Sequence, residues 1–77
     1  MNKIIHIAVK NQNCIQAGKA RIVDTPDEAT GDDTVYSGNR GSLIAEANEM
    51  YWRATNGAAG SYFRACAKNI MSELENI

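Results

Sequence analysis

The spacing of apolar residues changes once along this chain of 77 residues, and that change constrains the fold more than any other feature. Before residue 38, apolar side chains mostly alternate with others, which is the period of a strand. From residue 42 to residue 75 they recur every three or four positions, which is the period of a helix. The sequence therefore predicts one small α+β domain, with strands and a loop in residues 1–37 and a helical pair in residues 42–75.

Short strands are expected at residues 3–10, 14–23 and 34–36. In the first, Ile5, Ile7 and Val9 share one face. The strand pattern of the second is clearest over residues 20–23, and Gly18 indicates a bulge or a weak point within it. We expect a small antiparallel sheet of two to three strands.

Two helices are expected at residues 42–55 and 61–75, with Ser42 as the N-cap of the first. Gly57 favours a stop between them, because glycine readily takes the left-handed conformation. Two amphipathic helices joined by a short connection pack as an antiparallel pair, here on one face of the sheet. The alternative is one long helix kinked at Gly57 and Gly60, which would need an oligomer to cover its apolar stripes.

An acidic segment joins the second and third strands. Residues 24–33 hold five carboxylates and no basic side chain. Thr25, Pro26 and Glu28 form a capping-box pattern, which predicts one helical turn that Gly31 stops. The acid spacing does not fit a calcium-binding loop. We interpret the segment as a solvated connection or as a negative patch for a basic partner, with candidate contact residues Asp27, Glu28, Asp32 and Asp33.

The net charge of −1 hides a segregation of charge along the chain. Residues 1–23 carry four basic side chains and no acidic one: Lys3, Lys10, Lys19 and Arg21. This basic N-terminal hairpin is compatible with an alternative function, that of a small nucleic-acid-binding protein. The pI near 5.7 and the lack of a stacking aromatic on the strands argue against that function.

Trp52 is the most informative single residue. It lies about 140° from the centre of the apolar stripe of its helix. Tryptophan in such a place is typical of an interface anchor, although its own chain could also cover it. Arg53 lies beside it, and Arg64, Tyr62 and Lys68 extend the same candidate surface. Arg40, in the glycine-rich loop at residues 37–42, is a candidate for contacting an anion, unless that loop is an ordinary turn.

No combination of residues suggests a nucleophile, a base and an orienting group, so we expect no enzymatic activity. Cys14, Cys66 and His6 lack the spacing of metal ligands, and we expect no metal or cofactor. No signal-peptide pattern and no apolar run of membrane-spanning length is present. The expected location is therefore the cytoplasm, with reduced cysteines rather than a Cys14–Cys66 disulfide.

These observations predict a small non-catalytic protein-binding module that occupies a surface of a larger protein or protein–nucleic-acid complex. Short chains of this kind are typical of phage and plasmid accessory proteins, which suggests an inhibitor of a host defence complex. The alternative is nucleic-acid binding by the basic hairpin. A homodimer built on the two helices is a third possibility, because a second copy would enlarge a small core.

Overall fold

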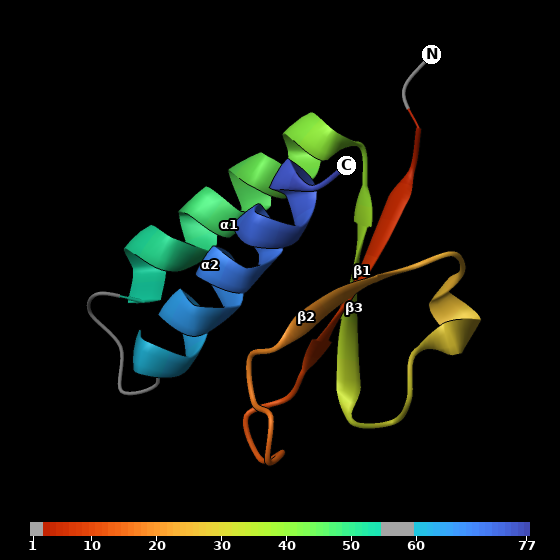
Figure 1. Ribbon diagram of the computed structural model, residues 1–77. Coiled ribbons are helices and arrows are strands. Elements are labelled where there is room, and N and C mark those ends of the chain that lie inside the picture. The colour runs from red at the N-terminus through yellow and green to blue at the C-terminus, as the bar shows by residue number, and fades with distance from the viewer. Residues whose placement is uncertain (1–2, 55–59) are drawn as a thin grey trace.

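The computed structural model describes residues 3–54 and 60–77. Its elements are β1 (Ile5–Lys10), β2 (Ala20–Val23), the 3-10 turn η1 (Pro26–Glu28), β3 (Asp33–Gly38), α1 (Arg40–Ala54) and α2 (Gly60–Glu75). The strands form one antiparallel sheet in the order β2-β1-β3, and both helices lie on one side of it (Figure 1). The predicted α+β architecture is confirmed.

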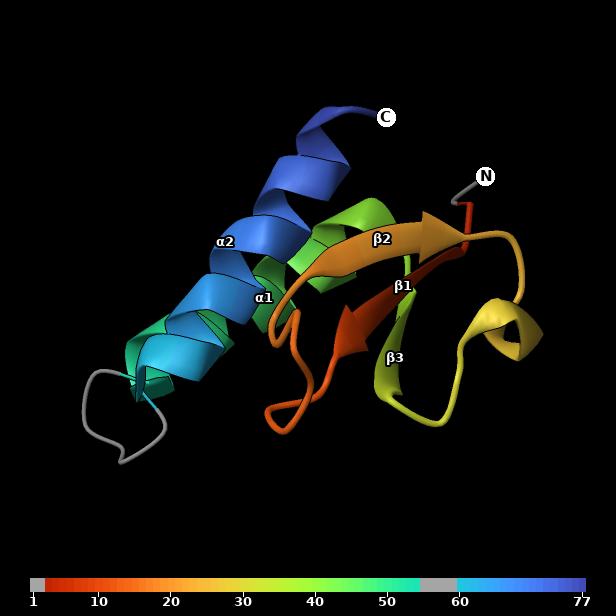
Figure 2. The same ribbon diagram turned by 60° about the horizontal axis from the view of Figure 1, so that its bottom comes forward.

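The core lies between the sheet and the helix pair. Ile7 and Val9 of the central strand are fully buried there, and Ile5 is nearly so. Burying each such side chain contributes about 1.5–3 kcal/mol. The helices complete this core with six residues of their predicted stripes: Leu43, Ala47, Cys66, Ala67, Ile70 and Leu74. Of the two helices, α2 lies against β2 and α1 against β3 (Figure 2).

A bulge at Gly18 closes the connection between β1 and β2. Gly18 has φ +85° and donates its N–H to the Lys10 carbonyl at 2.9 Å, while Lys10 donates to the Lys19 carbonyl at 3.0 Å. Gly18 and Lys19 therefore both lie opposite Lys10, which is the bulge that Gly18 suggested. The prediction that β2 begins at residue 14 was wrong, because residues 11–19 form consecutive turns that use their backbone groups locally.

The connection from β3 to α1 is shorter than expected. Ser37 and Gly38 belong to β3, and α1 begins at Arg40. The Asn39 side-chain oxygen accepts the Ser42 N–H at 2.8 Å, which makes Asn39 the capping residue. The prediction of Ser42 as N-cap was therefore wrong.

Two separate helices form, not one long kinked helix. Their close approach is marked by Gly60, where an added Cβ would collide with the carbonyl oxygen of Ala54. The predicted stop at Gly57 lies outside the described residues. The antiparallel pairing of α1 and α2 is confirmed (Figure 1).

The acidic segment contains the predicted turn. The Glu28 carboxylate accepts the backbone N–H groups of Asp24 at 2.6 Å and Thr25 at 3.0 Å, the arrangement expected of the acidic residue in a capping box. The turn ends at Glu28, followed by Ala29 in an extended conformation, so the prediction that Gly31 stops it was wrong.

Candidate functional site

Trp52 stands out from the surface of α1. Its side chain is 70% exposed, although it is the largest in the protein. Its ring meets that of Tyr51 edge to face, with centroids 6.0 Å apart and an interplanar angle of 87°. Tyr51 is itself packed against the core, so this contact joins the exposed indole to the interior.

A hollow of about 480 Å³ lies beside Trp52, between the two helices. The apolar part of its lining includes Ala47, Ala67 and Met71. The two alanines are buried, and their small side chains leave room for the hollow. Its polar part consists of Asn48, Lys68, Ser72 and Glu75. We call this hollow together with Trp52 and Tyr51 the Trp52 surface. It combines a protruding aromatic ring, an apolar floor and polar side chains of both charges.

The two arginines predicted to extend this surface have partners in the chain. Arg53 forms an ion pair with Glu49 one turn earlier on α1, and both side chains are exposed. Such a pair contributes only about 0.3–0.5 kcal/mol and can open readily for a partner. Arg64 donates from Nε to the Gly60 carbonyl at 3.4 Å. Tyr62 does not extend the surface, because its hydroxyl donates to the Lys10 carbonyl at 2.9 Å and holds α2 to the sheet.

Asp33 lies at the centre of an ion cluster that spans all three strands. Its carboxylate accepts Arg21 of β2 through two nitrogens, at 2.8 and 3.3 Å, and lies 3.3 Å from the Lys10 ammonium of β1. The backbone N–H of Thr30 also donates to it, at 2.9 Å. The side chain is fully enclosed, and the Arg21 guanidinium, followed by Thr30, holds the pKa of this carboxyl well below its usual range.

The four acidic candidates differ in how accessible they are. Asp33 is enclosed in its ion cluster, whereas Glu28 is exposed and uses its Oε2 within the turn η1. Asp27 and Asp32 are exposed at the surface. The negative patch is thus smaller than the sequence suggested.

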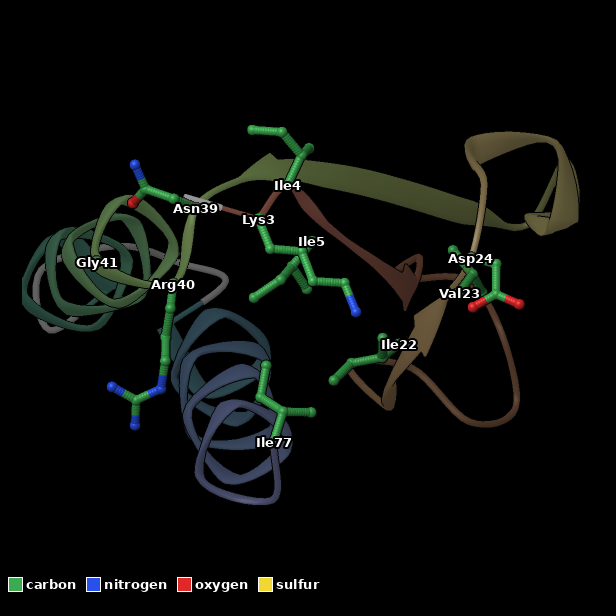
Figure 3. Close-up of a pocket in the computed structure, with 10 residues that line it drawn as sticks. All are labelled: Lys3, Ile4, Ile5, Ile22, Val23, Asp24, Asn39, Arg40, Gly41 and Ile77. Atoms are coloured by element: carbon green, nitrogen blue, oxygen red, sulfur yellow. The ribbon is translucent and has the colours of Figure 1, made fainter. Parts of the chain in front are cut away.

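Arg40 borders a second hollow, of about 470 Å³, where the start of β1, the end of β2 and the start of α1 meet (Figure 3). Ile5, Ile22 and Ile77 give it an apolar lining, and the Lys3 side chain extends across it. The Arg40 side chain points away from this hollow, and its Nε donates to the Leu74 carbonyl at 3.4 Å. The Asn39 cap and the first turn of α1 occupy the glycine-rich loop, and the role of Arg40 in contacting an anion stays a prediction.

One pair of residues that lie close together in space was not predicted from the sequence. His6 of β1 and Ser37 of β3 are register partners, and His6 Nδ1 lies 2.6 Å from Ser37 Oγ. No periodicity marks this pair, because the strands meet only in the folded sheet. Within residues 3–54 and 60–77, no hydrogen bond orients the other ring nitrogen of His6, so the pair lacks the third group of a nucleophilic triad.

The cysteines are both free thiols. Cys66 is buried in the core, where burial raises the pKa of its thiol. Cys14 lies in the β1–β2 connection, with its sulfur 3.6 Å from the Asp32 carbonyl. The part of the chain that the structure describes holds no group of three His, Cys, Asp or Glu side chains arranged for a metal ion. It also holds no helix of the length and hydropathy needed to cross a membrane.

Comparisons with protein families, with curated proteins and with solved structures found no match to this chain.

Proposed function

We propose that this protein is a non-catalytic protein-binding module that engages a larger protein through the Trp52 surface. The observation that carries the proposal is the 70% exposure of Trp52 beside an apolar hollow. Leaving a large aromatic ring in water forgoes the stabilisation that burial would give. A partner that covers the ring would recover it.

The composition of the Trp52 surface supports protein binding. Interface hot spots are enriched in tryptophan, tyrosine and arginine, lie over small pockets and are surrounded by polar residues that exclude water. Here Trp52 and Tyr51 supply the aromatic anchor, and Arg53 lies next to it in sequence. Lys68 and Glu75 supply polar groups of opposite charge. These charges favour a partner with a mixed rim around an apolar centre.

The ion cluster around Asp33 favours protein binding over the nucleic-acid alternative. Of the four basic residues in the first 23, Lys10 and Arg21 are engaged with this enclosed carboxylate. Lys3 and Lys19 remain as exposed cations of the hairpin. Fewer cations for phosphates mean weaker electrostatic binding to nucleic acid. Micromolar binding to random duplex or single-stranded DNA at low salt, weakening steeply as salt is added, would favour the alternative.

The test compares the proteins recovered by the parent with those recovered by the variant Trp52→Ala. The tagged protein is immobilised, cell extract from its source is passed over it, and recovered proteins are identified by mass spectrometry. Components of host defence complexes are the first candidates to examine, as the size class suggests. With a purified partner, we expect Trp52→Ala to weaken binding by about 30-fold, corresponding to a hot spot of about 2 kcal/mol.

Ile15→Ala is the matched control, since Ile15 is a fully exposed apolar residue on the β1–β2 connection and does not line the hollow beside Trp52. It should leave affinity unchanged, and both variants should keep the circular dichroism and melting temperature of the parent. Equal affinity of Trp52→Ala and the parent would refute the assignment of this surface. If instead the double variant Asp27→Lys/Asp32→Lys alone lost the partner, the acidic segment would be the contact.

A further inference from the structure

The outer edge of β3 carries backbone groups that the sheet leaves unpaired. Lys10 directs both its backbone N–H and its C=O toward the β2 side. Backbone groups alternate in direction along an antiparallel strand, so Val9 and Ile7 direct theirs toward β3. Their register partners there are Thr34 and Tyr36. These two residues therefore face inward, toward β1.

It follows that the residues between and after them face outward. Val35 and Ser37 each point an N–H and a C=O away from the sheet. The outward N–H of Asp33 is already bonded to the Thr30 carbonyl, at 3.1 Å. In the described ranges of the chain, no such bond reaches the backbone of Val35 or Ser37. The open part of the edge is thus two residues with four groups in the pattern of a strand.

Apart from the enclosed charge of Asp33 at its start, β3 lacks the features that keep strand edges from pairing. Such features are proline, a bulge, a protruding lysine or a very short strand. β3 spans six residues, has an unbroken register with β1 and contains neither proline nor lysine. Its sequence includes three successive residues that favour strands: Thr34, Val35 and Tyr36. The opposite edge differs, because β2 has only four residues and lies against α2 (Figure 2).

Opposite charges flank the two ends of β3. The exposed Asp32 and the rest of the acidic segment precede the strand, whereas Arg40 follows it. A parallel neighbour with the same sequence would bring like charges together. An antiparallel neighbour would place each acidic end beside the basic end of the other.

We propose that two copies of this chain pair through β3, antiparallel and around a two-fold axis at Tyr36, so that their sheets become continuous. In this register Val35 of each copy lies opposite Ser37 of the other, and all four unpaired groups of each edge are bonded. Asp32, just before β3 in each copy, then lies at the same end of the paired strands as Arg40, at the start of α1 in the other copy. The interface is independent of the Trp52 surface, and the dimer carries two such surfaces, which strengthens binding to a partner with two sites.

The first test uses proline as a probe of the edge. Val35→Pro removes the N–H that points outward, away from β1. Edge strands tolerate proline at such a position. Sedimentation equilibrium should show the parent passing from one to two chain masses between micromolar and submillimolar concentration. Val35→Pro should stay at one chain mass, with the circular dichroism of the parent. Val35→Thr, which keeps the N–H, should still dimerise.

Amide exchange provides a second, residue-specific measurement. The amides of Val35 and Ser37 should exchange more slowly as protein concentration rises, whereas those of Thr34 and Tyr36 should be protected throughout. Asp32→Arg should weaken the dimer, and adding Arg40→Asp should restore it. The proposal is wrong if the parent remains a monomer at submillimolar concentration. It is also wrong if Trp52→Ala dissociates the dimer while Val35→Pro does not, since the interface would then lie on the helices.

Discussion

At the scale of single residues, Asp33 joins the three strands of the sheet by charge. Its enclosed carboxylate binds Arg21, Lys10 and the backbone of Thr30. Asp33→Asn removes the charge and leaves two cations without their counter-ion. Hydrogen bonds to charged groups contribute about 1.5–3 kcal/mol each, so we expect a loss of about 2 kcal/mol in the free energy of unfolding. Urea unfolding at neutral pH measures this loss. Asp27 is an exposed acid of the same segment, so the control Asp27→Asn should change the free energy of unfolding by less than about 0.5 kcal/mol.

The same residue gives stability a defined dependence on pH. The pKa of Asp33 is held well below its usual range in the folded state by Arg21, whereas the unfolded chain has the ordinary value of about 3.9. Its contribution is therefore complete above about pH 4. Below that pH the unfolded state takes up the proton first, and the contribution shrinks as the pH falls toward the folded pKa. The stability difference between the parent and Asp33→Asn should narrow from neutral pH to about pH 3, and a constant difference would contradict this account.

Residue-level prediction from the sequence succeeded for the directions of side chains and failed for their partners. Alternation placed Ile5, Ile7 and Val9 on one face, because it depends only on the local direction of side chains, and that face is buried. It did not indicate that Ala8, on the opposite face, is fully buried as well. It could not identify the enclosure of Asp33 or the His6–Ser37 pair. Both depend on the register between strands, which the sequence pattern does not specify beyond which face is buried.

At the scale of elements, the start of α1 shows how two adjacent signals compete. Asn39 and Ser42 are both residues that favour N-caps, and the sequence alone led to Ser42. In the structure β3 continues to Gly38, so the chain has only Asn39 left before the helix begins. The Asn39 side chain then accepts the Ser42 N–H. The number of elements was predictable, while their ends depended on contacts between elements.

This difference can be measured directly. Asn39→Ala removes the acceptor for the Ser42 N–H and should lower the free energy of unfolding by about 1 kcal/mol. Ser42→Ala removes no hydrogen bond from the start of α1 and places a good helix former in its first turn, so its effect should be within about 0.5 kcal/mol. Thermal and urea unfolding of the two variants compare them under identical conditions. A larger loss for Ser42→Ala would show that the helix begins where the sequence alone suggested.

At the scale of the whole molecule, stability depends on how the sheet is joined to the helix layer. A chain of 77 residues buries little core, so individual contacts between layers weigh more than in a larger domain. Two hydrogen bonds connect the end of the β1–β2 hairpin to α2. The Tyr62 hydroxyl donates to the Lys10 carbonyl at 2.9 Å, and the Asn69 amide donates to the Gly18 carbonyl at 2.8 Å. Gly18 thus takes part in both the bulge and the contact between layers.

Gly18→Ala tests that junction. Gly18 has φ +85°, and an added Cβ would lie 3.4 Å from Ala65 Cβ and 3.6 Å from the Cys66 sulfur. Alanine at positive φ costs about 1–2 kcal/mol, and any shift of the bulge away from α2 would also lengthen the Asn69 hydrogen bond. We therefore expect a loss of about 2 kcal/mol, which for a domain of this size lowers the melting temperature by about 10 °C. Gly31→Ala is the matched control, because its Cβ meets nothing within 4 Å, and it should be neutral or stabilising by about 0.4–1 kcal/mol. Equal effects of the two substitutions would contradict both the positive φ of Gly18 and its close approach to α2.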